Sequence, residues 1–228
     1  RVERGLREFE SSLDAHLAHI RRESGDELMS QLVRVQEEGV GLDADGVRRQ
    51  AEEIVEANER LAPFRLLRGT ECDIRRDGAL DLAEDVLAEL DWVQVSVHGG
   101  QRGSREELTK RVLAALDSPY VSCLSHPTGR LIGHRPPNAV DLEVVLARLA
   151  EQGRAVEVNG LPDRLDLRDE HVRLAREAGV TVVCSTDAHS MRGLGNIELS
   201  VATARRGGAG PSDVLNTRPL AEVLERRF

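Results

Sequence analysis

The stretch Val121-Ser-Cys-Leu-Ser-His126 decides the fold, because it is a short apolar run that ends in a histidine and precedes an amphipathic segment. The same alternation runs from about residue 64 to the C-terminus. It is typical of β–α units around a parallel sheet. We therefore predict an α/β fold with strands at 64–71, 93–98, 121–126, 155–159 and 181–187. The predicted helices lie around 83–90, 104–116, 140–151 and 167–178, and a last helix ends near Phe228.

A different pattern occupies the beginning of the chain. Val2, Leu6, Phe9 and Leu13 recur at steps of three and four residues, which predicts an amphipathic helix. A loop near residue 40 follows, and a further helix passes through residues 54 and 61 with Asp43 or Asp45 as its N-cap. We expect two parts, a helical segment over 1–37 and an α/β domain over 38–228.

The composition favours a soluble, cytoplasmic protein with an aliphatic core. The 228 residues are 40% hydrophobic but include only one Trp, one Tyr and three Phe. No run of eighteen apolar residues is present, so no membrane-spanning segment is expected. The net charge of −9 argues against a surface that coats polyanions in general. The cysteines Cys72, Cys123 and Cys184 are odd in number and widely spaced, which predicts free thiols in a reducing compartment.

Five polar residues end the predicted strands, at spacings of 27, 28, 33 and 28 residues. Each interval is about the length of one β–α unit, roughly 30 residues. Parallel strands point the same way, so their ends meet at one rim of the sheet. We therefore expect these side chains to lie together. They are Glu71, His98, His126, Asn159 and Asp187.

Four of these residues are of metal-ligand types. Glu71, His98 and His126 supply a carboxylate and two imidazoles, a set that suits Zn²⁺, Mn²⁺ or Fe²⁺ with a position open for water. Asp187 and His189 are two residues apart, so on a strand both would face the same pocket. Water bound to such a cation loses its proton near neutral pH and becomes a nucleophile. The pattern predicts a metal-dependent hydrolase.

Other candidate residues have a simpler interpretation. His16 and His19 are at helical spacing, and His16 aligns with the apolar stripe, so packing is favoured over metal binding. His134 and His171 are expected at the surface. Arg130 and Arg164 follow strand ends and could bind a phosphate with two hydrogen bonds each, or could form loop salt bridges.

In combination, these motifs resemble the polymerase and histidinol phosphatase (PHP) domain, in particular the version at the C-terminus of bacterial X-family DNA polymerases. The likeness runs from about residue 38 to the C-terminus. The motifs that carry it are Gly69-Thr-Glu71-Cys-Asp-Ile, Ser96-Val-His98, Ser125-His126-Pro-Thr-Gly-Arg130, Glu157-Val-Asn159 and Ser185-Thr-Asp187-Ala-His189.

The resemblance implies a distorted seven-stranded β/α barrel with up to three metal ions and phosphoester hydrolysis, including 3′-end trimming of DNA in the polymerase version. The family's first two motifs, an early Asp-Leu-His-x-His and an Asp-His pair, are absent here, so the barrel is expected to be incomplete at its N-terminus. Glu71, His98 and His126 then correspond to one complete metal position. Asp187 is left as half of a second position shared with Glu71, and His189 as a fragment of a third.

These observations favour a metal-dependent phosphoesterase. In this hypothesis Glu71, Asp187 and His189 are catalytic, Arg130 or Arg164 holds the phosphate, and the substrate is a phosphate ester such as a DNA 3′ end. The alternative is a non-catalytic PHP domain that serves as a scaffold. A carbon–nitrogen amidohydrolase is less favoured because it would also need an early His-x-His. An incomplete barrel exposes a sheet edge, which the N-terminal helices or a second copy in a homodimer would have to cover.

Overall fold

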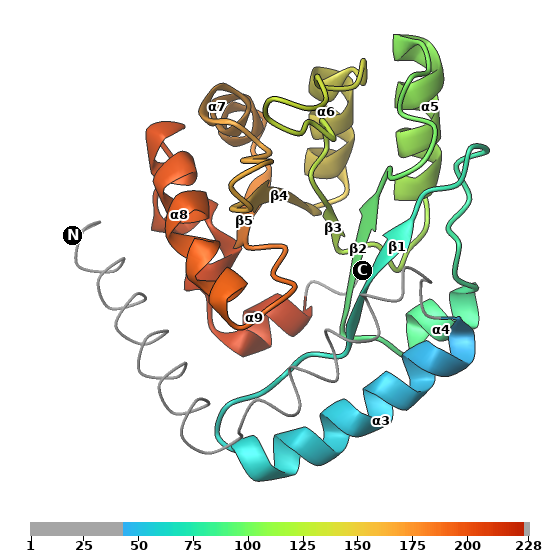
Figure 1. Ribbon diagram of the computed structural model, residues 1–228, viewed down its shortest axis with the longest axis vertical. Coiled ribbons are helices and arrows are strands. Elements are labelled where there is room, and N and C mark those ends of the chain that lie inside the picture. Colours follow the sequence, from blue (N-terminus) through green and yellow to red (C-terminus); the bar gives the residue numbers. More distant parts are fainter. Residues whose placement is uncertain (1–42, 226–228) are drawn as a thin grey trace.

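The computed structural model describes residues 43–225. Three predictions lie outside these residues: the helical segment over 1–37, the packing role of His16 and His19, and the end of the last helix near Phe228. The segment 43–225 contains a parallel sheet with helices packed against it (Figure 1).

The sheet has five strands in the order of the sequence, and every neighbouring pair is parallel. Figure 1 shows the strands pointing toward the end of the molecule at which α5, α6 and α7 stand. All strand carboxyl ends therefore meet at one rim. The strands are β1 (Gly69–Asp73), β2 (Trp92–Ser96), β3 (Cys123–Leu124), β4 (Ala155–Asn159) and β5 (Thr181–Ser185).

Helices connect the strands and surround one side of the sheet. Figure 1 shows α5, α6, α7 and α8 in succession around the sheet, with α3 across its lower end. Asp43, one of the two residues predicted as a possible N-cap, is the N-cap of α3. Its carboxylate accepts a hydrogen bond from the Gly46 amide. The helices are α3 (Ala44–Leu61), α4 (Glu84–Ala88), α5 (Arg105–Leu116), α6 (Leu142–Glu151), α7 (Asp169–Glu177), α8 (Ile197–Arg206) and α9 (Leu220–Glu225).

The predicted strands are in the right places and the fourth has the predicted bounds, but the bounds of the other four differ, in three cases for identifiable reasons. The first begins at residue 69 and not 64, because the side-chain amide of Asn58 hydrogen-bonds both the N–H and the C=O of Leu66. The third covers only 123–124, and the last stops at 185. His126 and Asp187 have φ values of 25° and 50°, which end the extended backbone at both places.

The helix between the last strand and the C-terminal helix was not predicted. Helix α8 packs against β4, β5 and α7, and the hydroxyl of the buried Ser200 hydrogen-bonds the carbonyl of Val158. Its buried positions include two hydroxyl residues, Ser200 and Thr203, so its apolar stripe is weak in the sequence. This weakness explains the omission.

The core is aliphatic, as the composition predicted. One cluster of buried Val, Leu, Ile, Ala and Cys side chains joins the sheet to the helices. The free cysteines Cys72, Cys123 and Cys184 are all buried, and Cys72 and Cys184 belong to this cluster. No described helix combines the length and the apolar character needed to cross a membrane.

A seven-stranded barrel is not seen within residues 43–225, where the sheet has five strands and two edges. At the β5 edge, Val182 forms an isolated parallel bridge to Val214. At the β1 edge, the amide of Asp81 donates to the carbonyl of Asp73, and Ile74 bridges Leu80. The structure therefore supports an α/β architecture with a parallel sheet.

A buried arginine ties together the loops that follow β1 and β2. Arg111 on α5 is 7% exposed, and its Nε and Nη1 donate to the carbonyls of Arg75 and Gly99 at 2.8 and 2.7 Å. Its Nη2 donates to the carbonyl of Ile74. The carbonyls of residues 74 and 75 follow β1, which carries Glu71, and the carbonyl of residue 99 directly follows His98. Arg111 therefore helps to fix the positions of both loops at the rim.

We predict that Arg111→Lys destabilises the fold by about 2–3 kcal/mol, because an ammonium cannot reach three carbonyls that the planar guanidinium satisfies together. The free energy of unfolding in urea measures this change. Arg105→Lys on the same helix is the control. Arg105 is exposed and, among the described residues, its side chain pairs only with Asp141, so its change should stay within about 0.5 kcal/mol. Equal effects of the two substitutions would contradict the role of Arg111.

Candidate metal centre

Glu71, His98 and His126 come together at the carboxyl ends of the first three strands. Glu71 lies on β1, His98 two residues beyond β2, and His126 two residues beyond β3. One ligand atom from each lies within 4.8 Å of those of the other two. Oε1 of Glu71 is 2.7 Å from Nε2 of His126 and 3.6 Å from Nε2 of His98. The predicted convergence of these three residues is therefore present.

Asp73 orients the ring of His98. Its Oδ1 lies 2.6 Å from Nδ1 of His98, a hydrogen bond in which the imidazole donates when Nδ1 carries the proton. Nε2 is then the basic nitrogen, and it faces Glu71. Such a carboxylate–imidazole pair fixes the tautomer and raises the basicity of the nitrogen that would bind a metal.

His126 is buried and lacks hydrogen-bond partners at its ring. The residue is 2% exposed, and neither ring nitrogen has a hydrogen-bond partner within the described part of the chain. Although Nε2 lies close to Oε1 of Glu71, the two groups are not aligned as a hydrogen bond. Unpartnered buried nitrogens are costly. A cation between His126 and Glu71 would satisfy Nε2.

The electrostatics of the cluster favour charged forms of both partners. Burial opposes ionisation of Glu71, but the close contact with His126 and the charge of His98 outweigh it and hold the pKa of Glu71 at about 2. Burial likewise would lower the pKa of His126, yet its contact with Glu71 dominates and raises that pKa. Glu71 is therefore a carboxylate at neutral pH, as a metal ligand must be.

The donor set fits a divalent transition metal. Two imidazole nitrogens and one carboxylate oxygen are ligands that Zn²⁺, Mn²⁺ and Fe²⁺ accept, and three protein ligands leave positions for water or substrate. Glu71 and His98 are accessible to solvent, whereas His126 closes the inner side. In residues 43–225 this is the one group of at least three His, Cys, Asp or Glu side chains that comes within 4.8 Å.

Asp187 and His189 lie outside that group of three. The carboxylate of Asp187 is nearly buried, and its Oδ2 lies 3.0 Å from Nε of Arg164 and accepts a hydrogen bond from Asn159. Because β5 ends at Ser185, strand alternation does not place these two side chains. They nevertheless lie close together: Nδ1 of His189 is 3.7 Å from Oδ1 of Asp187 and 2.8 Å from its main-chain oxygen.

The two arginines of the sequence hypothesis have different surroundings. Arg130 donates from Nε to the carbonyl of Arg164 at 2.7 Å and from Nη2 to that of Leu165, so two of its donors are used by main chain. Arg164 has a side chain that is 14% exposed, and its Nε and Nη1 have no aligned hydrogen-bond acceptor among the described residues. Of the two, Arg164 retains donors for an anion.

A cavity of about 330 Å³ opens beside the candidate metal centre. Glu71 on β1 and Asp187 beyond β5 both line it, so the cavity extends from the three-residue metal centre to Asp187. Its walls include carboxylates, hydroxyls, an amide and apolar side chains: Glu71, Gln94, Ser125, Glu157, Cys184, Ser185, Thr186, Asp187, Leu194 and Ile197.

Two residues of the site were missed as candidates. Asp73 is two positions after Glu71, and on a strand that spacing places both carboxylates on one face, which was a usable signal. Glu157 lies in an otherwise apolar strand and is 2% exposed. A charged residue within a buried strand was a second signal. Of the histidines expected at the surface, His134 is exposed, but His171 is only half exposed and contacts Arg168.

No family model matches the chain. The chain is 41% identical to the "DNA polymerase/3′-5′ exonuclease PolX" of Bacillus subtilis (strain 168) over 183 residues, which are 80% of this chain and 32% of that protein. It is 29% identical to a probable phosphatase of Thermoanaerobacter sp. (strain X514) over 169 residues, which cover 70% and 66% of the two chains. A probable phosphatase of Acetivibrio thermocellus is 32% identical over 139 residues, 58% and 55% of the two chains.

The fold and the site define an α/β domain with a candidate metal centre at the carboxyl ends of its strands. With these similarities, the chain is related to the PHP domain, in a version close to that of PolX. The chain spans about a third of the length of the B. subtilis protein and about two thirds of the Thermoanaerobacter protein.

A buried carboxyl group next to the site generates a prediction about pH. Asp166 is fully buried, accepts a hydrogen bond from the Thr128 amide, and has no partner at Oδ1 within residues 43–225. Burial raises the pKa of Asp166 to about 6, from an ordinary value of 3.8. Between about pH 4 and 6 the folded chain therefore retains a proton that the unfolded chain has released.

The unfolding free energy should fall as the pH rises through this window, by roughly 3 kcal/mol, because the unfolded state binds fewer protons there. Asp166→Asn, which stays neutral, should abolish this fall. Urea unfolding at pH 4, 5, 6 and 7 measures both chains. The lowered pKa of Glu71 acts below about pH 4.5 and with opposite sign, so the two effects separate. A wild-type stability that rises from pH 4 to 6 would refute the assignment.

Proposed function

We propose that this protein is a metal-dependent phosphoesterase of the PHP type. The observation that carries the proposal is the convergence of Glu71, His98 and His126, with a buried imidazole whose nitrogens have no hydrogen-bond partner among the described residues. The relatives named as phosphatases and as an exonuclease support a phosphate ester as the bond that is cleaved.

In this proposal Nε2 of His98, a nitrogen of His126 and the carboxylate of Glu71 hold a divalent ion, with Zn²⁺, Mn²⁺ and Fe²⁺ as candidates. Such an ion supplies positive charge for a phosphoryl oxygen and lowers the pKa of water. Asp73 keeps the basic nitrogen of His98 toward the ion.

Arg164 is the residue that we propose to bind the phosphoryl group. Its guanidinium lies next to Asp187, which lines the cavity together with Glu71, and two of its nitrogens have no aligned acceptor in the described structure. A guanidinium can donate two parallel hydrogen bonds to a phosphate. Arg130 supports this arrangement indirectly, because it holds the carbonyls of residues 164 and 165.

His189 and Asp187 are the proposed proton-transfer residues. Nδ1 of His189 faces the carbonyl oxygen of Asp187, so a proton on Nδ1 is held there and Nε2 becomes the free basic atom. The side chain of His189 is 57% exposed and can reach solvent. An imidazole in this state can take a proton from water or give one to the leaving oxygen.

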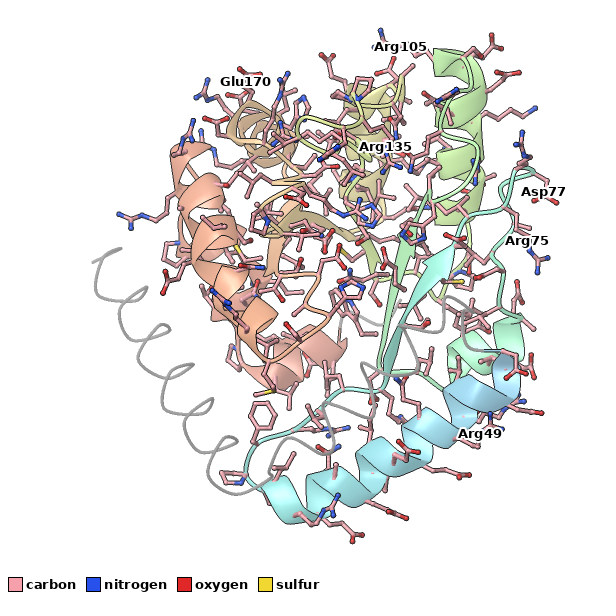
Figure 2. The ribbon with its side chains drawn as sticks, viewed as in Figure 1. Arg49, Arg75, Asp77, Arg105, Arg135 and Glu170 are labelled. Carbon is pink, nitrogen blue, oxygen red and sulfur yellow. The ribbon has the colours of Figure 1, made fainter. Side chains whose placement is uncertain are left out.

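We further propose a DNA 3′ end as a substrate, since the B. subtilis relative is named a 3′-5′ exonuclease. The loops after the strands carry basic residues despite the acidic total charge. Figure 2 shows Arg75, Arg105 and Arg135 toward the end of the molecule to which the strands point, with Arg49 on α3 at the other end. Such residues could contact phosphates along a strand. A reducing, cytoplasmic environment agrees with three buried free thiols.

The second candidate function is a non-catalytic scaffold. The observation in its favour is that Asp187 pairs with Arg164 and Asn159 and lies outside the three-ligand group of the described chain. A second copy in a homodimer that covers the β1 edge would agree with this role. Metal content and turnover distinguish the scaffold from the enzyme.

We predict that Mn²⁺ stimulates hydrolysis of a chromogenic phosphodiester and of 3′-recessed DNA, and that His98→Ala lowers this activity by about 100-fold or more. Removal of a ligand's outer partner alone already reduces metal affinity by about 10–100-fold, so loss of the ligand should cost at least as much. Initial rates at several Mn²⁺ concentrations provide the measurement. His134→Ala, at an exposed loop position, is the control and should leave the rate unchanged.

The proposal is wrong if added metal gives no turnover on either substrate. Bound metal without turnover would favour the scaffold. Turnover of the small diester alone would retain the phosphoesterase but remove the DNA 3′ end as substrate.

A separate prediction concerns Arg164. Arg164→Ala should raise KM for the chromogenic diester by about 10-fold, because one charge-assisted hydrogen bond contributes about 1.5–3 kcal/mol. Metal affinity should change by less than about twofold, since Arg164 is not among the three ligands. Arg168→Ala, at an exposed position paired with Glu170, is the matched control. An unchanged KM in Arg164→Ala would exclude the phosphate role.

A further inference from the structure

Glu157 is a buried carboxylate at the centre of the sheet. It lies on β4, between β3 and β5, and is 2% exposed. No Lys, Arg or His nitrogen forms an ion pair with it among residues 43–225. A buried carboxylate is costly unless donors satisfy it. A carboxylate in this fully buried strand therefore calls for donors and a role.

Neutral donors from three strand ends converge on this carboxylate. Oε2 accepts from the hydroxyl of Ser125 at 2.8 Å, from the amide of His126 at 2.6 Å and from Asn159 at 3.3 Å. Oε1 accepts from the hydroxyl of Ser185 at 2.5 Å and from Gln94 at 3.5 Å. Glu157 thus links the ends of β3, β4 and β5.

The hydrogen bond to the His126 amide has a specific consequence. His126 has a φ of 25°, a backbone conformation that residues other than glycine rarely adopt. A short hydrogen bond to a charged acceptor can hold this conformation. In this conformation Nε2 of the imidazole lies 2.7 Å from Oε1 of Glu71.

We propose that Glu157 is a positioning residue that holds His126 in the conformation required for metal binding. This inference rests on the proposed function, because it assumes that His126 is a ligand. Glu157 acts through the main chain of residues 125 and 126 and not as a ligand itself. Its negative charge, in a buried environment, also increases the attraction for a cation at His126.

Co²⁺ binding to the full chain tests the inference, since Co²⁺ absorption in the visible range reports both affinity and ligand geometry. Glu157→Gln keeps the size of the side chain but removes the charge and one acceptor oxygen. We expect this variant to bind Co²⁺ about 10–100-fold more weakly than wild type, with an altered absorption band.

Val158→Ala is the matched control. Val158 is the next residue of β4, is fully buried and belongs to the hydrophobic core, so its truncation destabilises the fold without touching the site. We expect a lower melting temperature but an unchanged Co²⁺ affinity and band. A merely structural role for Glu157 would give the same result in Glu157→Gln.

A second variant covers the case in which Glu157→Gln does not fold. Ser125→Ala removes one donor to the same oxygen that holds His126, and one such hydrogen bond is worth about 1 kcal/mol. We expect a loss of about fivefold in Co²⁺ affinity.

The outcomes separate the two proposals. Absence of a saturable Co²⁺ band in wild type, or a band that persists in His98→Ala, overturns the metal centre and the proposed function. If wild type shows the band and Glu157→Gln has the same band position and Co²⁺ affinity, only the role of Glu157 is overturned. Where Glu157→Gln does not fold, the same result in Ser125→Ala overturns it. Weaker binding in the tested variant but not in Val158→Ala supports it.

Discussion

The common direction of the five strands is the constraint on which the site depends. Each strand is followed by a connection that returns to the lower end of the sheet, so every strand presents its carboxyl end at one rim (Figure 1). Glu71, His98 and His126 are separated by whole β–α units, yet one ligand atom from each lies within 4.8 Å of the others. Antiparallel pairing of β2 with its neighbours would move His98 to the opposite end. The convergence of the three side chains therefore depends on strand direction more than on any local sequence motif.

The same rim contains polar groups that the core must accommodate. Glu157 and Asp166 are buried carboxyls, and Arg111 is a buried guanidinium, and each is partnered mainly by main-chain groups or neutral side chains. Such contacts contribute little net stability in comparison with an apolar core. They do fix the positions of the loops after β1, β2 and β3. We infer that these residues specify the geometry of the site more than the stability of the fold.

The order of the strands and of the helices between them could be predicted from the sequence, because alternation of apolar runs and amphipathic segments is a local signal, whereas α8 could not. Apart from both ends of β4 and the start of β5, the strand ends could not be predicted, since they depend on tertiary contacts. The side chain of Asn58 hydrogen-bonds the main chain of Leu66 before β1, and the carboxylate of Glu157 on β4 accepts a hydrogen bond from the amide of His126 after β3. The triad of ligand residues followed from spacing alone. Asp73 was missed, although the alternation of side chains along a strand places it on the same face as Glu71. The pairing of Asp187 with Arg164 depends on the conformation of the loops that carry them and could not be predicted from the sequence.

The charges at the rim form two separate units. Glu71 faces two imidazoles, which are good metal ligands when their nitrogens are unprotonated, so a divalent ion can take the place of a proton there. Asp187 faces the guanidinium of Arg164, which is always protonated and cannot ligate a metal. To bring Asp187 to a cation, this ion pair would have to be broken in a nearly buried place, where charges interact strongly. Under the proposed function, the first unit would bind a cation and the second an anion, and a phosphate ester in the cavity between Glu71 and Asp187 would contact both.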